Sequence, residues 1–441
     1  MAPTTSIPTP VATTPALLPD SLSPQKLLPR FRTVRALTVA WSRLLTEEDQ
    51  MVQSCAEASP VKWHLAHSAW FFETFVLRPY DPSYKPLNPD FLWLFNSYYN
   101  LVSDQPDKSL RASFSRPSLK HVLEYRAYVD QAVDRLLSAN ALSLDALTTI
   151  DIGLHHEQQH QELIATDIKH AFFTNPLHPA LRPLESPLPT AAAASSSPAW
   201  LSLNPGLISI GHDGDEFSFD NERPRHPYFI GEFSLARSLV SCRDYLAFIQ
   251  DGGYSKNNLW LSAGSDHIRA NNIAAPLYWR RDPNNDWEIF TLHGFMPLSA
   301  LADTPVCHLS YYEADAFAHW AGARLPSEFE WEIAAASQTP GNSGFLDIHA
   351  LQHGVLQPTR LDALYGSLWQ WTHSAYSPYP GYRPLEGALG EYNGKFMSGQ
   401  MVLRGGSIVT PTDHIRPTYR NFFHPPTRWQ FSGIRLAKSP S

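Results

Sequence analysis

The sequence predicts a multidomain protein of the α and α+β classes, in which an N-terminal four-helix bundle precedes a C-terminal α+β domain. Three observations lead to this fold class. Residues 26–175 place apolar side chains at helical spacing between helix-capping residues and prolines. Residues 176–199 are rich in Pro, Ala and Ser and nearly free of charge, as in a linker. Residues 200–439 alternate short strand-like segments with turns that hold Gly, Asn, Asp and Pro.

Four helices are expected in the first domain. A serine stands at or just before the start of three of them, where a side-chain oxygen caps free backbone N–H groups, and a proline marks the end of the second and the fourth. The links between them are short except for a long loop at 79–117, as in a four-helix bundle. The expected helices are Lys26 to about Cys55, Ser59–Pro60 to Arg78, Ser118 to Ser138, and Ser143 to Asn175.

Three helices are expected in the second domain, at 241–250, at 310–321 and from Ser327 onward. The last begins with a capping box, because Glu330 stands three residues after Ser327. Residues 1–25 lack a basic start followed by an apolar stretch. They are expected to form a disordered tail rather than a signal peptide.

Composition excludes several function classes. The 441 residues are 43% hydrophobic and carry a net charge of -8 without a block of basic residues, so a nucleic-acid or anionic-membrane surface is not expected. No apolar run reaches the ~18 residues of a membrane span. The three cysteines lie far apart in the sequence, which argues against a disulfide framework or a cysteine metal site. A cytoplasmic protein with reduced thiols fits these features.

A pair of histidines on the fourth expected helix indicates a metal site. His156 and His160 are four residues apart and therefore share one helix face. Ile152, Leu163 and Asp167 continue that face, so both imidazoles lie in the stripe that the bundle buries. Burying two imidazoles is costly unless something satisfies their nitrogens, and a metal ion does so.

A third ligand is expected from another helix. The second helix offers His64 and His67, and the spacing alone leaves both open. Three histidines without a carboxylate suit iron(II), zinc or nickel, and an open three-ligand site is typical of catalysis. Glu162 lies about 240° around the helix from His156, so it is expected to support a ligand residue by a hydrogen bond or to act as a capping residue. His155 is expected to face solvent or to make such a supporting contact. His170 lies too far along the helix to join the site.

Several motifs together resemble the ergothioneine-biosynthesis sulfoxide synthases of the EgtB type. The N-terminal motifs are Leu65-Ala66-His67 and His156-x3-His160-x-Glu162. Four C-terminal motifs follow in family order: Arg324 to Glu332, Trp369-Gln370-Trp371-Thr372, Leu403 to Ser407, and Gly433 to Leu436. The resemblance covers residues 26–439. It implies a DinB-like four-helix bundle joined to a formylglycine-generating-enzyme-like domain of the C-type-lectin-like fold.

The resemblance also implies chemistry. Members of the family bind one non-haem iron(II) through three histidines, which map to His67, His156 and His160. They use O2 to join the sulfur of L-cysteine or γ-glutamylcysteine to C2 of the imidazole of hercynine, giving a sulfoxide. The stretch from Arg420 to Pro425 holds no cysteine, whereas formylglycine-generating enzymes carry a catalytic cysteine pair there, so formylglycine formation is not expected.

Further site residues follow from the same resemblance. The loop Asn96-Ser97-Tyr98-Tyr99-Asn100 resembles the subgroup that uses free cysteine, and either Tyr98 or Tyr99 is expected to donate a proton. Tyr392 is the competing donor, and simple packing of the two loop tyrosines is the alternative. Gln159 is expected to contact hercynine or iron-bound water. Phe422 and Phe423 are expected to form the wall for the quaternary ammonium of hercynine. The candidates for binding a substrate carboxylate are Arg111, Arg116 and Arg420.

Two other functions share some of these features. A DinB-like, metal-dependent thiol transferase would have the same three histidines but would need neither the second domain nor the Tyr98-Tyr99 loop. A non-enzymatic lectin-like binding protein would use the histidines for structure alone. An inward-facing set of only three protein ligands argues against that second alternative.

Overall fold

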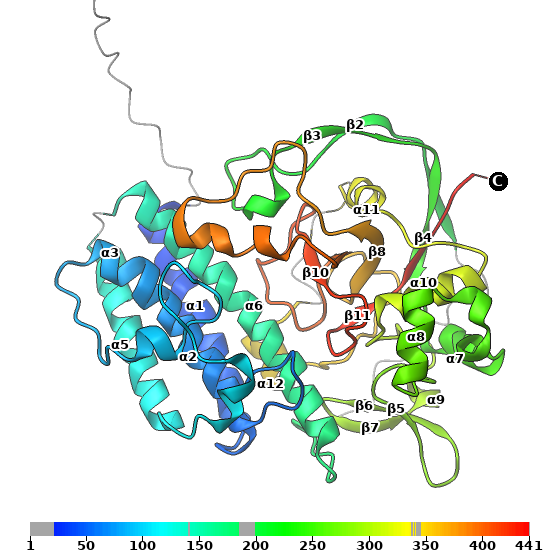
Figure 1. Ribbon diagram of the computed structural model, residues 1–441, viewed down its shortest axis with the longest axis horizontal. Helices are drawn as coiled ribbons and strands as arrows, with labels where there is room; N and C mark the ends of the chain where they lie inside the picture. The colour runs from blue at the N-terminus through cyan, green and yellow to red at the C-terminus, as the bar shows by residue number, and fades with distance from the viewer. Residues whose placement is uncertain are drawn as a thin grey trace, which may run out of the picture.

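The computed structural model describes residues 22–139, 142–184, 199–336, 338, 340 and 345–440 (Figure 1). It shows an N-terminal helical part and a C-terminal part of mixed helices and small sheets, which confirms the predicted fold class. Most of the expected tail, at 1–21, and of the expected linker, at 185–198, lies outside the described residues.

Four long helices pack together in the helical part. Their contacts join α2 to α5 and α6, and α1 to α5 and α6. Between α2 and α5, the long loop carries short helical turns. The bounds are α1 Pro24–Arg43, α2 Val61–Phe72, a π-helical turn at Glu73–Leu77, α3 Arg78–Tyr80, α4 Phe91–Leu94, a 3-10 turn at Lys108–Ser113, α5 Leu119–Ser138 and α6 Leu144–Thr174.

Capping explains where several helices begin. The side chains of Ser118 and Ser143 accept hydrogen bonds from backbone N–H groups at the starts of α5 and α6, as expected. Two predicted boundaries are wrong. The first helix ends at Arg43 instead of near Cys55, and the 3-10 turn Asp49–Met51 follows after a short irregular stretch. The second begins at Val61 after Pro60, while Ser59 bonds elsewhere.

The C-terminal part contains four small sheets flanked by short helices. Their strand orders are β1-β4-β12, β10-β9-β8-β11, β2-β3 and β5-β6-β7. The strand bounds are β1 Trp200–Leu203, β2 Gly206–Ile210, β3 His226–Ile230, β4 Phe233–Leu239, β5 Trp279–Arg281, β6 Trp287–Thr291, β7 Gly294–Pro297, β8 Trp369–Ala375, β9 Met401–Arg404, β10 Asn421–Phe423, β11 Ser432–Gly433 and β12 Arg435–Lys438.

The three helices expected in this part are present, each with a capping box. They are α7 Cys242–Gln250, α10 Tyr311–Trp320 and α11 Glu328–Ala335. Three more were not expected: α8 Ser262–Ala270, α9 Leu298–Leu301 and α12 Ile348–His353. Among the described residues, no helix is long and apolar enough to cross a membrane.

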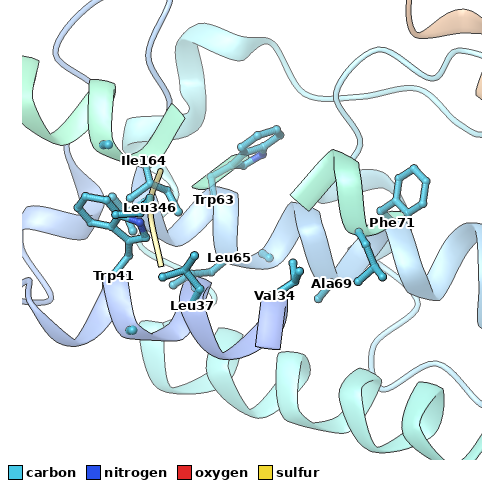
Figure 2. Close-up of a cluster of buried hydrophobic side chains, with 14 of the residues drawn as sticks. Val34, Leu37, Trp41, Trp63, Leu65, Ala69, Phe71, Ile164 and Leu346 are labelled. Atoms are coloured by element: carbon cyan, nitrogen blue, oxygen red, sulfur yellow. The ribbon is translucent and has the colours of Figure 1, made fainter. Parts of the chain in front are cut away.

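One hydrophobic core runs through both parts. Trp41 on α1, Leu65 on α2 and Ile164 on α6 are buried in the same cluster as Leu346, which precedes α12 in the C-terminal part (Figure 2). The cluster continues to Leu368 and Phe431 and to other buried residues of the C-terminal part. Helix α6 therefore lies between the rest of the bundle and the C-terminal part, as Figure 1 also shows.

Candidate metal centre

Three histidines of the helical part meet at one point. One nitrogen from each of His67, His156 and His160 lies within 4.8 Å of the others, and all three side chains are buried. His67 comes from α2, and His156 and His160 come from adjacent turns of α6. The structure thus brings together the three residues to which the sequence resemblance pointed.

The hydrogen bonds of His67 leave a nitrogen free to bind a metal. Its Nδ1 lies 2.6 Å from the carbonyl oxygen of Phe95, which can only accept, so Nδ1 carries the proton. Its Nε2 is buried and has no hydrogen-bond partner among the described residues. A buried lone pair without a partner is costly, and a metal ion at this position would remove that cost.

His156 also has an unpaired nitrogen, whereas His160 contacts a histidine through each of its nitrogens. The Nε2 atoms of His156 and His160 face each other at 3.2 Å, and Nδ1 of His156 has no partner among the described residues. Either a proton or a cation must lie between two imidazole nitrogens at that distance, and a metal ion would serve both rings. An all-imidazole donor set of three fits a divalent transition metal such as iron(II).

Burial keeps these imidazoles neutral. It lowers the pKa of His67 and His160 well below the usual value and lowers the pKa of His156 to about 3; neighbouring histidines add to the effect at all three. Neutral imidazole is the form that binds metals. Aromatic rings hold the site in place: His67 stacks between Trp63 and Trp70, at 4.5 and 5.2 Å between ring centroids, and His156 stacks on Phe71 at 4.7 Å.

His64 is not a free ligand. Its Nδ1 lies 2.7 Å from Nδ1 of His160, and its Nε2 lies 3.0 Å from Oδ2 of Asp167. The three-histidine cluster contains His67 and not His64, which favours His67 over the alternative that the sequence spacing left open. His170 bonds to Ser54 Oγ at 2.7 Å, away from the cluster, as expected.

A small cavity adjoins His156, and a larger cavity shares part of its wall. The small one of ≈20 Å³ is lined by His156, Gln159, Tyr99 and Tyr392, among others. The larger one of ≈160 Å³ has Gln159 and Tyr392 in its wall too, and lies between α6 and the C-terminal part. Gln159 therefore lines both cavities, next to the ligand candidate His160 in the sequence.

The Gln159 amide is held by two phenols. Its Nε2 donates to the hydroxyl of Tyr419 at 2.7 Å, and its Oε1 accepts a hydrogen bond from the hydroxyl of Tyr392. Tyr392 follows the 3-10 turn Gly387–Glu391, and its ring centroid lies 6.3 Å from that of His156. These two hydrogen bonds fix the orientation of the Gln159 amide in the cavity wall.

The loop tyrosines lie next to the same space. Tyr99 is buried against Trp70 and Phe75 and lines the small cavity. Tyr98 contacts Tyr99 and Tyr392, with ring centroids 4.7 and 5.8 Å away. Burial raises the pKa of Tyr98, Tyr99 and Tyr392, so each phenol keeps its proton at neutral pH.

Phe422 and Phe423 both line the larger cavity from β10. Phe422 stacks on Tyr376 with ring centroids 4.0 Å apart, so one of its faces is covered. Phe423 packs its edge against Trp429 at 5.3 Å. Trp369 and Tyr419 add further aromatic surface to the same cavity, and sequence analysis did not identify either as a cavity residue.

The three candidate arginines differ in their partners. Arg420 is fully engaged, because Nε and Nη2 donate to Glu328 at 2.8 and 3.0 Å. Arg116 is exposed. Arg111 is buried and donates to two hydroxyls, Ser59 Oγ and Ser97 Oγ, at 2.9 and 3.2 Å.

Arg111 also covers a wall of the metal cluster. Its guanidinium lies 3.5 Å from the ring centroid of Trp63, which stacks on His67. Burial lowers its pKa to about 10, so it is charged at neutral pH.

The expectation that His155 faces solvent is wrong, because its side chain is 3% exposed. It stacks on Phe217 and bonds to Arg30 and to His414. The expectation for Glu162 is wrong too. Within the part of the chain that the structure describes, its carboxylate bonds neither to a ligand histidine nor to a helix end, and instead accepts hydrogen bonds from Trp369, Ser407 and Thr410 of the C-terminal part. No local pattern in the sequence points to His414, because its partner His155 is 259 positions away.

Comparison with known proteins supports the same family. The family model described as sulfatase-modifying factor enzyme 1-like domain matches residues 185–346 and 357–440. Hercynine oxygenase of Mycobacterium tuberculosis is 30% identical, over 95% of this chain and 99% of that protein. Hercynine oxygenase of Mycolicibacterium smegmatis is 29% identical over 95% of this chain and 98% of that protein.

A more distant relative carries a related name. Ergothioneine biosynthesis protein 1 of Schizosaccharomyces pombe is 25% identical over 53% of this chain and 29% of that protein. Near-complete coverage at 30% identity extends beyond the shared C-terminal domain and includes the helical part with its three histidines. The chain belongs to the EgtB-type hercynine oxygenases and is an oxidoreductase built on their two-part architecture.

Proposed function

We propose that this enzyme is an iron(II)-dependent sulfoxide synthase of ergothioneine biosynthesis. It joins the sulfur of cysteine to C2 of the hercynine imidazole and oxidises that sulfur to the sulfoxide. The C2–H and S–H bonds break and a C–S and an S–O bond form. O2 takes up the four electrons and two protons, so that one oxygen atom enters the sulfoxide and the other leaves as water.

The observation that carries the proposal is a buried cluster of three neutral imidazoles, two of which have an unpaired nitrogen, next to a small cavity with aromatic walls. His67, His156 and His160 would hold the iron. Bound there, iron(II) would supply O2 activation and would favour the thiolate over the thiol of the second substrate. Ligands from three side chains leave coordination positions for substrates, and binding them together makes their reaction effectively intramolecular.

Hercynine is proposed to occupy the larger cavity. Its trimethylammonium group suits the faces of Phe422 and Phe423, and contact between a cation and an aromatic face contributes roughly 0.5–2 kcal/mol. The amide of Gln159 would meet the imidazole, because Tyr392 and Tyr419 fix its orientation in the wall that the two cavities share.

Cysteine is proposed to bind on the other side of the ligand cluster. Arg111 is buried and charged and has no carboxylate partner in the hydrogen bonds of its guanidinium, which go to two serine hydroxyls. A substrate carboxylate would complete that pairing. The bulky rings of Tyr98 and Tyr99 limit the room beside the site, which favours free cysteine over γ-glutamylcysteine.

A phenol is proposed to supply the proton that the chemistry needs. Tyr98 and Tyr99 are our first candidates because of the loop they share, and Tyr392 is the alternative from the C-terminal part. All three stay protonated at neutral pH and lie around the small cavity or against one another.

The decisive experiment is a reconstitution. The protein is loaded anaerobically with iron(II), given hercynine with either cysteine or γ-glutamylcysteine, and exposed to O2; products are identified by mass. We expect the sulfoxide, with cysteine preferred. A product formed without O2 would support the thiol-transferase alternative, and no product with any thiol would support a binding protein.

Ligand variants complete the test. His67→Ala, His156→Ala and His160→Ala should each lower the bound iron and abolish O2-dependent turnover. His170→Ala is the matched control, because this histidine lies on the same helix but bonds to Ser54. Full iron occupancy in two of the three ligand variants would contradict the assignment.

A further inference from the structure

His160 is held from behind by a second histidine. The Nδ1 atoms of His64 and His160 are 2.7 Å apart, so one proton lies between them. Both rings are buried, with exposed fractions of 2% for His64 and 8% for His160. The position of that proton decides whether His160 presents a lone pair or an N–H to the ligand cluster.

Asp167 decides the position of the proton. Its Oδ2 lies 3.0 Å from Nε2 of His64 and also accepts the backbone N–H of Ser59 at 2.8 Å. Because this oxygen already acts as an acceptor for the Ser59 N–H, it also accepts from His64, which therefore carries its proton on Nε2. Its Nδ1 then accepts from Nδ1–H of His160, and Nε2 of His160 is left as a bare lone pair facing His156.

The remaining oxygen of Asp167 is bound by the other part of the molecule. Its Oδ1 accepts a hydrogen bond from the indole Nε1–H of Trp429 at 2.9 Å. Trp429 lies between β10 and β11 of the C-terminal part and is 7% exposed, whereas Asp167 is on α6. The hydroxyl of Thr166 donates to the same Oδ1 atom at the longer distance of 3.5 Å. Donors on both oxygens fix the carboxylate plane and, through it, the ring of His64.

We propose that Trp429, Asp167 and His64 form a hydrogen-bonded chain that positions His160 as a metal ligand, so that the C-terminal part strengthens metal binding in the helical part. The inference rests on the metal site of the proposed function. Trp429, Asp167 and His64 are positioning residues, because none of their side chains supplies a ligand in the cluster. The docked C-terminal part thus helps to build the metal site as well as the substrate cavity.

The size of the effect can be anticipated. Removing a group that orients a metal-ligating histidine typically costs 10–100-fold in metal affinity. Asp167→Asn keeps the shape of the side chain but must direct an NH2 group either toward Trp429 or toward Ser59 and His64, where donors already point. We expect it to weaken binding by about 10–100-fold, and Trp429→Phe, which removes only one N–H, by a smaller factor of roughly five.

The test measures metal affinity without turnover. Cobalt(II) and anaerobic iron(II) are titrated into the full-length protein against a chelator, and the cobalt absorption spectrum reports the ligand field. Trp429→Phe should raise the dissociation constant and change the spectrum. Trp260→Phe is the matched control, because its indole also donates a buried hydrogen bond, to the carbonyl of Gly253, with no link to the site.

The double variant separates a chain from independent effects. If Trp429 acts through Asp167, combining Trp429→Phe with Asp167→Asn should weaken binding by much less than the product of the two single factors. Multiplicative losses, or an unchanged dissociation constant in Trp429→Phe alone, would overturn the inference. The Trp429 variant suffices if Asp167→Asn does not fold. A wild-type protein that binds neither metal would instead refute the proposed site itself.

Discussion

The Nδ1 atoms of His155 and His414 lie 3.0 Å apart and join α6 to the C-terminal part. The contact continues on the far side of His414, whose Nε2 is 3.1 Å from the hydroxyl of Tyr419. That hydroxyl accepts from Nε2 of Gln159 at 2.7 Å. The residue after each of these α6 side chains is a proposed metal ligand. Helix α6 therefore carries two of the three proposed ligands together with the groups that tie them to the second part.

His414→Phe tests this connection. The phenyl ring fills the space but cannot bond to Tyr419 or to His155, so the Gln159 amide should lose part of its support. We expect the KM for hercynine to rise roughly fivefold, the effect of losing about 1 kcal/mol of hydrogen bonding. Iron content and the KM for cysteine should not change. His226→Phe, a buried histidine that bonds to Pro224, is the control; an equal effect there would remove the support for the prediction.

Replacing the proton-donating tyrosine by Phe should change the product and leave binding intact. The change removes one hydroxyl, so less C–S bond should form and more thiol should be oxidised to the sulfinic acid. Tyr98→Phe, Tyr99→Phe and Tyr392→Phe are compared by the ratio of the two products. Tyr392→Phe also removes the hydrogen bond to Gln159, so its KM for hercynine is measured too.

The result also bears on the choice of thiol. If both loop variants keep the wild-type product ratio while Tyr392→Phe changes it, the donor comes from the C-terminal part. The preference for cysteine over γ-glutamylcysteine would then lose its main support.

Arg111→Gln should weaken cysteine binding selectively. The guanidinium charge is buried, and a substrate carboxylate paired with it is worth about 1.5–3 kcal/mol, so the KM for cysteine should rise by one to two orders of magnitude. The KM for hercynine should stay within twofold. Arg116→Gln changes an exposed arginine of the same loop and should have no effect. Equal rises in both KM values would point to a general loss of structure.

Glu157 should make the fold sensitive to acid. Burial alone would raise its pKa, but the charges of Arg126 and Arg35 and the hydroxyl of Thr38 outweigh burial and lower the pKa to about 2. Because the folded pKa is below the unfolded value of ~4.3, this contribution is full above about pH 4.5 and is lost as the pH falls toward 2. A shift of that size corresponds to roughly 3 kcal/mol.

Urea unfolding of the metal-free protein between pH 3 and 7 checks this prediction. Glu157→Gln should lower the free energy of unfolding at pH 7 by about 3 kcal/mol and flatten its dependence on pH. Asp134→Asn is the control, since an ion pair with the exposed Arg32 contributes little. A variant with an unchanged pH slope would show that other groups cause the acid sensitivity, such as the buried histidines whose pKa is lowered.

Local signals in the sequence predicted most helices correctly. The serines before α5, α6, α7, α10 and α11 each cap the helix that was expected to follow. The ligand pair on α6 followed from helical spacing, and the third ligand from family resemblance. The end of α1 was misplaced because the apolar pattern continues through Leu44 and Leu45 after the helix has ended.

Other features depend on contacts that no local pattern carries. His155 was assigned partly to solvent because 100° of rotation separates it from His156, but the C-terminal part covers that face too. The spacing on the second helix left His64 as an alternative ligand, but its two nitrogens bond to His160 and Asp167. Trp429 reaches Asp167 from 262 positions away, and a single sequence gives no sign of that pairing.

The hydrophobic core shared by the two parts has a consequence for how the protein comes apart. Leu346 packs in the cluster that holds Trp41 and Ile164, and Leu368 and Phe431 extend it. Separating the parts would expose this apolar surface on both sides. Neither part is then expected to fold when it is expressed without the other. The whole chain should unfold in one calorimetric transition, whose van't Hoff enthalpy equals the calorimetric enthalpy.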